Sequence, residues 1–573
     1  MTKCLSKKFM LALVLIFCMM LSACSGAVSS NQSQSDSQGS SGPDSQVSAS
    51  EQETTGITDP NVNPPGVFPI CKEPIVLTMG VVQSMFVEDY ETNALALYME
   101  ELGNMDIQFV IFPSNSSEAN QKLEVMINSG TELPDVLMGF SFDSMALLNY
   151  GSQGVFLALN DYIDTIGVEV HDAFERVSID NLRELMTQAD GNIYNLPKYT
   201  EQVGNMHSQR QWINQVWLDN LGLDMPTTTD DFTEVLKAFR DLDPNQNGKK
   251  DEVPFTGSQG WQSSSLDAIM NAFIYNDAAS PNNKPRWILE NGILDTPYTK
   301  EEWREGLRYL KMLVSEGLLS PMCITQDVTQ LQELLAAGDE SQVGVYTAGA
   351  NLFGATDERK LDYAPLPPLT GPEGVCWTAF YPSAPGGGFI ITKFADHPEA
   401  AFRLGDYCMS EDMAFRSRFG VPEVDWREPG PDDKGLYEDL GFEPVVVPIL
   451  PFNSVQNSYF GINAVLRLGI QDGQAVTVDD PLYTELFIAE AVPYYLGKTP
   501  KEYVDLIKYN QEEYDQIKDI YSTLVTYVNE SMARFVTGDM DLDTQWDAYL
   551  EELDNIGLQR FVEISQTAYD RDH

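Results

Sequence analysis

An alternation of extended and helical segments between residues 74 and 141 constrains the fold more than any other part of this chain. The runs PIVLTMGVVQS, DIQFVIFPSN and LPDVLMGFS are apolar and partly β-branched, which is typical of buried strands. The intervening YETNALALYMEELGN and EANQKLEVMINSGTE place apolar residues at helical spacing. Strands joined by crossover helices run parallel, so this region predicts an α/β domain with a parallel sheet.

The chain is also too long to fold around one core. It has 573 residues, and the part after residue 66 is about 505 residues long, whereas single cores stop growing at roughly 250–300 residues. Further strand and helix patterns follow, in SQVGVYTAG and in GGGFIITKFADHPEAAFRLGDYCMS, and the tail from about Tyr483 is rich in helical patterns. We therefore expect at least two α/β domains.

The N-terminus predicts export. Three lysines precede an apolar run from Phe9 to Leu21, roughly 13 residues, which suits a signal peptide and is too short to span a membrane. The sequence L-S-A-C that follows resembles the lipobox of bacterial lipoproteins. That resemblance implies a signal peptide at residues 1–23, cleavage before Cys24 and acylation of its sulfur, for example with palmitate. A plain secretory signal with an incidental cysteine is the alternative.

Residues 24–66 are rich in Ser, Gln, Asp and Gly and nearly free of large apolar side chains. Such a segment cannot bury enough surface to offset its ordering entropy, so we predict a disordered tether. No later run approaches 18 uninterrupted apolar residues, which predicts a soluble body held at the membrane by the lipid.

Charge and cysteine content exclude several classes of function. Signal cleavage removes three of the 35 Lys and Arg and none of the 86 Asp and Glu, and this negative field excludes nucleic-acid binding. The remaining cysteines outside the signal and the lipid site are widely spaced without a C-x-x-C pair, which argues against zinc. Both unpaired thiols and disulfides stay open for Cys71, Cys323, Cys376 and Cys408.

The segment DPNQNGKKDE at residues 243–252 predicts a calcium site. It places oxygen-bearing side chains at alternate positions and a glycine at the sixth, as an EF-hand loop does. The twelfth position is Pro254 rather than Glu, so the bidentate acid would come from Glu252. No neighbouring base is visible, so the ion would be structural; the alternative is an ordinary Asp/Asn/Gly turn. The candidate Ca²⁺ ligands are Asp243, Asn245, Asn247, Lys249 through its carbonyl, Asp251 and Glu252.

Several stretches, taken in order, resemble one family. They are LEVMINSGTELPDVLMG, GNIYNLP, the run from Trp212 to Phe255, GGGFIITKFADHPEAAFRLGDYCMS and RFGVPEVDW. Together with the lipobox and tether, they are similar to the extracellular solute-binding proteins, family 1, of carbohydrate ABC importers. The closest likeness is to the lipoprotein group that includes alginate- and other oligosaccharide-binding proteins. The resemblance covers nearly all of the chain from about Ile75 onward.

The resemblance implies a two-lobed, hinged α/β fold of the type II periplasmic-binding-protein kind with a helix-rich C-terminal extension. The chain would cross between lobes near Pro197–Thr200 and Tyr381–Gly386. In calcium-containing relatives the D-x-N-x-N-G-x-x-D-E loop binds Ca²⁺, which agrees with the ligands named above. The expected parts are lobe 1 at 67–198 and 384–430, lobe 2 at 199–383, and a helical region at 431–573 that returns to lobe 2 and packs across both.

The implied function is capture of an oligosaccharide in the cleft between the lobes and delivery to an ABC permease. The protein would be a lipid-anchored monomer at the outer face of the bacterial membrane and not an enzyme. The strongly acidic composition favours a neutral saccharide over a polyuronate, because a polyuronate would need a basic cleft.

Sugars stack on aromatic rings and bond to planar polar side chains, so exposed aromatics near loop ends are the candidate ligand contacts. A buried core aromatic is the alternative for each. Asp135 is a further candidate because it is expected at the carboxyl end of a parallel strand, where ligands of α/β sheets gather; its alternative is a helix cap. The aromatic candidates are Trp261, Trp377, Tyr381, Tyr346 and Tyr199.

Two other functions remain open from the sequence. The paired carboxylates of a glycoside hydrolase could be present among 86 acids, although neither G-x-S-x-G nor H-E-x-x-H occurs and there are only four histidines. A sensor that presents its solute to a membrane receptor would have the same fold and ligand as a transport protein. Incubation with candidate glycans would distinguish a hydrolase from a binding protein, because only a hydrolase cleaves them. Genomic neighbours would distinguish a sensor from a transport protein.

Overall fold

The computed structural model describes residues 57–572 except 85–86, 115, 141, 177–180, 261, 278–284, 355–356, 382–385, 451–456, 461–465, 468 and 477–483. The predicted signal peptide, the lipid site at Cys24, most of the tether and Trp261 therefore lie outside the described residues. Across the described part of the chain, no helix is both long enough and apolar enough to cross a bilayer.

The first sheet has six strands in the order β15-β4-β11-β3-β1-β2. β1 pairs with β2 and with β3 in parallel, which confirms the predicted strand–helix–strand–helix–strand unit. β11 is antiparallel to β3 and β4, so the sheet is mixed. Its strands are β1 (Ile75–Val82), β2 (Met105–Phe112), β3 (Val136–Met138), β4 (Leu196–Thr200), β11 (Gly386–Ile391) and β15 (Leu466–Arg467).

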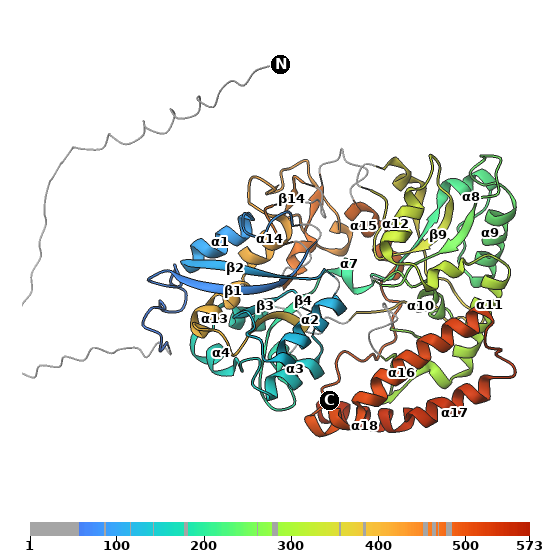
Figure 1. Ribbon diagram of the computed structural model, residues 1–573. Helices are drawn as coiled ribbons and strands as arrows, with labels where there is room; N and C mark the ends of the chain where they lie inside the picture. The colour runs from blue at the N-terminus through green and yellow to red at the C-terminus, as the bar shows by residue number, and fades with distance from the viewer. Residues whose placement is uncertain are drawn as a thin grey trace, which may run out of the picture. The chain divides into compact units, whose positions relative to one another are not determined.

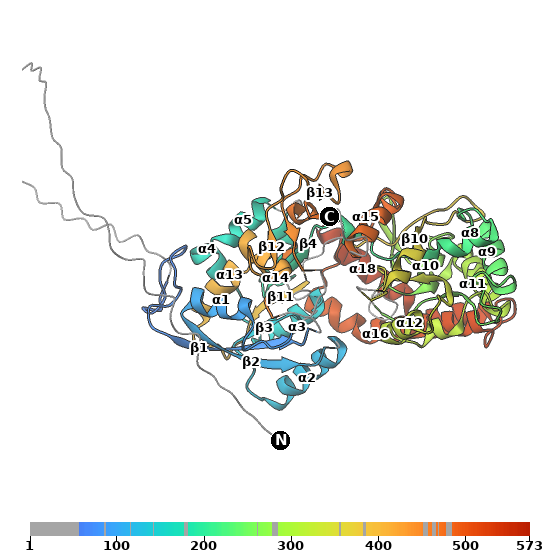
Figure 2. The ribbon, with the colours of Figure 1, turned by 90° about the horizontal axis from the view of Figure 1, so that it is seen from above.

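Helices cover both faces of this sheet, and Figure 2 shows α1 and α2 on opposite sides of β1 and β2. One face packs Leu77 and Met79 against α1 and α13, and the other packs Leu137 and Ile390 against α2 and α3. Because both faces are buried at its centre, β3 is apolar throughout, whereas the outer strand β2 begins with alternating buried and exposed residues. The helices of this lobe are α1 (Ala94–Gly103), α2 (Ser116–Ser129), α3 (Ser144–Ser152), α4 (Asn160–Ile166), α5 (Glu169–Arg176), α6 (Leu182–Met186), α13 (Pro398–Tyr407) and α14 (Glu411–Phe419).

The first described residues are fastened to α13. The backbone N–H groups of Thr58 and Asp59 donate to the Glu399 carboxylate at 3.0 and 2.9 Å. One turn along the helix, the Arg403 guanidinium donates to the carbonyl oxygens of Asn63 and Pro64 at 2.7 and 2.9 Å. Glu399 and Arg403 are both buried. The segment therefore enters the lobe through charge-assisted hydrogen bonds to one helix.

The second sheet has four strands in the order β10-β5-β9-β6. One face packs on α8 to α11, which Figure 1 shows in green beside β9, and the other packs on α12 and α15. The elements of this part are β5 (Gln211–Asn214), β6 (Val253–Thr256), β7 (Ile288–Glu290), β8 (Ile293–Asp295), β9 (Val343–Thr347), β10 (Tyr363–Leu366), α8 (Gln215–Leu221), α9 (Thr229–Asp241), α10 (Ser265–Met270), α11 (Glu301–Ser315), α12 (Val328–Ala336) and α15 (Thr484–Tyr495).

The predicted helical region at 431–573 is helical only from α15 onward, so that prediction is wrong for its first part. The described residues between 431 and 476 form short strands, 3-10 turns and loops, because Gly and Pro in PGPDDKG and FEPVVVPILP interrupt helical hydrogen bonding. Their strands are β13 (Lys434–Gly435), β14 (Val447–Pro448) and β16 (Ala475–Val476), with β12 (Trp426–Arg427) just before them. The last helices are α16 (Gln511–Thr537), α17 (Trp546–Ile556) and α18 (Leu558–Asp572).

The last helices, α16 to α18, are drawn in red in Figure 1. They pack together, and α16 packs on α11 of the second lobe. α16 also contacts α3, and the Lys508 ammonium donates to the Glu184 carbonyl at 2.9 Å. The tail is thus bonded to helices that cover both sheets.

The chain passes from the first sheet to the second through α7 (Val203–Met206), and it returns toward the first sheet through residues 376–381. We call residues 201–210 the first crossing segment and 376–381 the second. They are bonded to each other: Tyr381 N–H donates to Met206 O at 2.9 Å, and His207 Nδ1 lies 3.1 Å from Thr378 Oγ1. Thr378 N–H also donates to Lys498 O at 2.9 Å, in the loop after α15. The hinge is therefore a hydrogen-bonded unit.

A buried ion pair supports the second lobe and yields a stability prediction. The Arg286 guanidinium lies 2.8 Å from the Asp267 carboxylate and donates to Asn529 of α16 at 3.0 Å, and both charged side chains are 1% exposed. Arg286→Met leaves Asp267 charged and buried, so we expect a loss of about 3–5 kcal/mol in the free energy of unfolding, measured by urea denaturation.

The matched control is Arg308→Met, which removes the exposed pair with Asp543 and should change stability by about 1 kcal/mol or less. Equal losses in the two variants would contradict the role given to the buried pair.

Candidate functional site

One edge of the second sheet gathers the strand ends at which ligands of α/β proteins bind. β6 and β9 are parallel and both end there, at Thr256 and Thr347. β5 runs the other way and begins there, with Gln211 opposite Thr347 and Leu366. The first crossing segment leads from Thr200, the last residue of β4, to this edge. β10 also ends there, at Leu366, so this edge joins the carboxyl ends of β6, β9 and β10 to the hinge.

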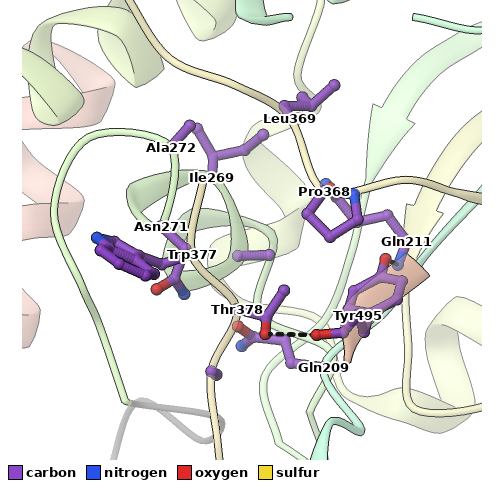
Figure 3. Close-up of a pocket in the computed structure, with 12 residues that line it drawn as sticks. Gln209, Gln211, Ile269, Asn271, Ala272, Pro368, Leu369, Trp377, Thr378 and Tyr495 are labelled. Atoms are coloured by element: carbon purple, nitrogen blue, oxygen red, sulfur yellow. Dashed lines mark hydrogen bonds between the residues drawn. The ribbon is translucent and has the colours of Figure 1, made fainter. Parts of the chain in front are cut away.

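A small cavity of about 20 Å³ lies at this edge. Figure 3 shows Trp377 and Asn271 on one side of it and Gln211, Pro368 and Tyr495 on the other. Its walls come from β5, the end of α10, the loop after β10, the two crossing segments and the last residue of α15. A ligand group placed here would contact hinge and lobe together.

Buried polar side chains at this edge lack partners among the described residues. Ser208 Oγ, Gln211 Nε2 and Ser258 Oγ are buried without a hydrogen bond from any described group. Native proteins leave few such groups unpaired, because each loses its bonds to water without replacement. Three unpaired polar groups beside the same strand ends could form hydrogen bonds to the hydroxyl groups of a ligand.

The structure places one of the predicted aromatics in the cavity wall and another at the end of the second crossing segment. Trp377 is half-buried and lines the cavity, and its backbone N–H donates to Asn271 O at 3.0 Å. Tyr381 ends the second crossing segment, and burial raises the pKa of its hydroxyl, so the ring stays neutral. Tyr199 lies in β4, but its side chain, like all of Trp261, falls outside the described residues.

Two other predicted contacts are wrong. Tyr346 has no exposed surface; its ring packs in the core below the second sheet and its hydroxyl donates to Asn351 Oδ1 at 3.0 Å. Asp135 precedes β3 rather than following it, so it lies at the opposite edge of the first sheet. Its carboxylate accepts from the N–H and hydroxyl of Thr78 at 2.7 and 2.8 Å, which ties β3 to β1.

Charged side chains surround the first crossing segment. The Asp472 carboxylate, in the 3-10 turn at Gly469–Asp472, is 2% exposed and accepts Val203 N–H of α7 at 2.8 Å. The fully buried Arg210 donates to the carbonyl of Gly204 and to that of Gly349. The Asp472 carboxylate and the Arg210 guanidinium thus both bond to the backbone of α7.

Nearby charges act on these groups. Burial raises the pKa of the Asp472 carboxyl to about 7, with Glu485 and Glu201 adding to the rise and Val203 N–H and Arg418 opposing it. Burial, with a smaller contribution from Arg210, lowers the pKa of His207 to about 4. His207 is therefore neutral at physiological pH, whereas Asp472 titrates there.

The 243–252 loop forms the turn expected of an EF-hand-like segment. Asp243 Oδ1 and Oδ2 accept the N–H groups of Asn247 and Gly248, each at 3.1 Å, and Asn247 Oδ1 accepts Lys249 N–H at 2.7 Å. Gly248 has φ of +75°, which glycine adopts without strain. The Lys249 side chain is exposed, so its ammonium group does not occupy the interior of the loop, where the oxygen ligands would lie.

The chemistry of this donor set fits a hard cation. Glu252 Oε1 is buried without a hydrogen-bond partner among the described residues. Burial raises the pKa of Glu252, and the negative charges of Asp251 and Asp243 raise it further. A cation would offset both effects. No three acidic, histidine or cysteine side chains in the described ranges converge on one point, so amide and main-chain oxygens would complete the coordination.

The family model of the bacterial extracellular solute-binding proteins matches residues 88–414, more than half of the chain. The chain belongs to this family. Its membership confirms the predicted family, and likeness to solved structures confirms the two-lobed, hinged type II fold with a helix-rich C-terminus. The protein is a solute-binding protein that works outside the cytoplasm.

Individual relatives extend over most of its length. FusA of Streptococcus pneumoniae serotype 4, a fructooligosaccharide ABC transporter substrate-binding protein, is 26% identical over 525 residues, 88% of this chain and 91% of FusA. YtcQ of Bacillus subtilis strain 168, a polygalacturonan/rhamnogalacturonan-binding protein, is 22% identical over 485 residues, 82% of this chain and 87% of YtcQ.

Solved structures of FusA share the fold. One is a complex with kestose and another is an EF-hand mutant in complex with fructo-nystose. Each has a TM-score of 0.70 and 23% identity and covers 87% of this chain and 99% of FusA.

The titration of Asp472 predicts a pH dependence of stability. Because the folded-state pKa is about 7 against an ordinary 3.8, folding favours the protonated acid. This stabilisation is present near pH 4 and is lost as the pH rises to about 7. Asp472→Asn stays neutral and keeps an acceptor for Val203, so its stability relative to the parent should rise by up to about 1.4 kcal/mol per pH unit over that range and then level off. Urea denaturation at a series of pH values measures this.

Asp433→Asn is the matched control in the same region. Hydrogen bonds from Arg427 and from Gly430 N–H lower the pKa of Asp433 to about 2, so its removal should shift stability by an amount independent of pH from about pH 4 upward. A pH-independent difference for Asp472→Asn as well would contradict the assignment.

Proposed function

We propose that this solute-binding protein captures a neutral oligosaccharide at the edge of the second sheet and delivers it to an ABC importer. The observation that carries the proposal is the meeting of unpartnered buried polar side chains with the half-buried ring of Trp377 beside the hinge. Aromatic faces take the C–H face of a sugar, and planar amides bond to its hydroxyls.

The lining favours a neutral ligand. None of the side chains that line the cavity carries a charge; its polar members are amides, hydroxyls and an indole. A uronate carboxylate would need a guanidinium or ammonium group to offset its desolvation. Of the two ligand classes named for the relatives, the fructooligosaccharides of FusA fit such a lining better than the polygalacturonan of YtcQ.

The same proposal covers location and partner. Cleavage before Cys24 and acylation of its sulfur would hold the protein at the outer face of the membrane. There the protein, as a monomer, would deliver the saccharide to the permease subunits. Incubation of the protein with neutral glycans tests the hydrolase alternative: release of shorter products would overturn the transport role, while thermal shifts without cleavage support it.

We further propose that the 243–252 loop binds a structural Ca²⁺. Asp243, Asn245, Asn247, Asp251, Glu252 and the carbonyl of Lys249 would hold it. The buried, unpartnered oxygen of Glu252 and the sixth-position glycine support this, as does the description of one FusA variant as an EF-hand mutant. The loop connects α9 to β6, so the ion would stabilise the strand whose far end carries Ser258.

Truncation of the aromatic platform tests the saccharide site. Trp377→Ala should weaken binding of a neutral oligosaccharide by about tenfold, because the stacking surface is lost while the half-buried position leaves the fold intact. Calorimetry with a saccharide chosen from a thermal-shift panel measures the affinity.

Tyr494→Ala removes an exposed aromatic next to the site and should leave the affinity unchanged. If Trp377→Ala binds the saccharide with unchanged affinity, Trp377 does not contact the ligand.

Calcium removal tests the loop. At a calcium concentration of about 100 times Kd, a bound ion would stabilise the protein by about 2.7 kcal/mol. Asp243→Ala should lower the melting temperature in calcium buffer by the amount that a chelator lowers it in the parent, and the variant should not respond to chelator. Asp224→Ala, an exposed acid outside the loop, should respond as the parent does. A chelator response that survives in Asp243→Ala would show that the loop is only a turn.

A further inference from the structure

Gln211 differs from three other polar side chains around the cavity, those of Asn271, Tyr495 and Thr378. The Asn271 amide bonds to Asn276 and to Asp267 O, and the Tyr495 hydroxyl accepts Gln211 N–H and donates to Leu366 O. The Thr378 hydroxyl meets His207 and Tyr495 O. These groups are already satisfied within the protein.

The Gln211 side chain is 5% exposed, and its Nε2 has no hydrogen-bond partner among the described residues. Its backbone is fixed at the first position of β5 by pairing with Thr347 and Leu366. Figure 3 shows the amide at the cavity wall next to Tyr495. A rigid strand therefore presents an unused donor to the cavity, and a donor kept in place without a partner is unfavourable in the free protein.

The cavity volume limits what this donor can meet. About 20 Å³ accommodates one oxygen-sized group, since a single water needs roughly 10–15 Å³ and two or more polar partners. A carboxylate placed here would have no cationic side chain in the lining to offset its desolvation.

We infer that Gln211 is a specificity-determining residue whose amide donates a hydrogen bond to one hydroxyl oxygen of a neutral sugar stacked on Trp377. The inference rests on the proposed saccharide-binding function and specifies one contact within it. The sugar residue at this position keeps a free hydroxyl, and its deoxy or O-methyl analogue is rejected, because the analogue leaves the amide unpaired or overfills the cavity.

The test replaces Gln211 with a residue of similar length that cannot donate. Gln211→Met should weaken binding of a neutral oligosaccharide, one that the parent binds in the panel, by roughly three- to tenfold in calorimetry. The melting temperature of the ligand-free protein should stay at or slightly above the parent value, since the replaced donor had no partner to lose.

Gln215→Met is the matched control. It removes the same group from a half-exposed glutamine just beyond β5 that bonds to Asp219 at 2.9 Å, away from the cavity. Its saccharide affinity should equal that of the parent. If Gln211→Met does not fold, Gln211→Asn, which retains the amide but withdraws it from the cavity, should show the same loss of affinity.

A panel of monodeoxy saccharides locates the contact. The parent should lose affinity for one deoxy analogue, and Gln211→Met should bind that analogue and the unmodified sugar equally.

The outcomes separate this inference from the function on which it rests. If the parent binds no saccharide, the proposed function fails. If the parent binds and Gln211→Met binds equally well, with the same response to every deoxy analogue, only the role of Gln211 fails. A lower melting temperature of free Gln211→Met with unchanged affinity would mean that the amide holds a structural water, and would also overturn it.

Discussion

The backbone and side chain of Thr378 join the segments on which the site depends. Its N–H bonds to the loop after α15, its hydroxyl meets His207 of the first crossing segment, and its neighbour Trp377 faces the cavity. Because His207 stays neutral, this contact is independent of pH over the range in which Asp472 titrates. A ligand that moves Trp377 would therefore shift Thr378 and, through it, both crossing segments. Protonation of Asp472 would change only the hydrogen bond to α7.

The edge of the second sheet is positioned from a distance. β6 runs from the 243–252 loop to the segment that carries Ser258, and β9 lies between β6 and β5. The loop is linked to the residues just before β9, because Gln342 Nε2 donates to Asp251 at 3.3 Å and Asn245 to Ser341 O at 3.4 Å. An ion bound in the loop would thus restrain two strands whose other ends face the ligand, without touching the ligand itself.

Local patterns predicted the parallel unit of the first sheet well, since strand and helix periodicities there extend over whole elements. Predictions for single residues depended on long-range contacts and were less accurate. Asp135 lies before β3 rather than at its carboxyl end, and its carboxylate bonds to Thr78 of β1. Tyr346 was expected in the cleft, but α12 and α15 cover that face of the sheet. Gln211 carries no local signal: its role comes from Tyr495 and Trp377, which lie far along the chain.

The attachment of residues 58–67 to α13 has a mechanical consequence. Glu399 and Arg403 bond to this segment at two places one turn apart along the helix, so tension applied at its N-terminal end would load these hydrogen bonds first. The strain would pass into the buried interior beneath α13 and leave the hinge untouched. If the N-terminus is held at a membrane, tension applied there would reach α13 before it reaches the crossing segments.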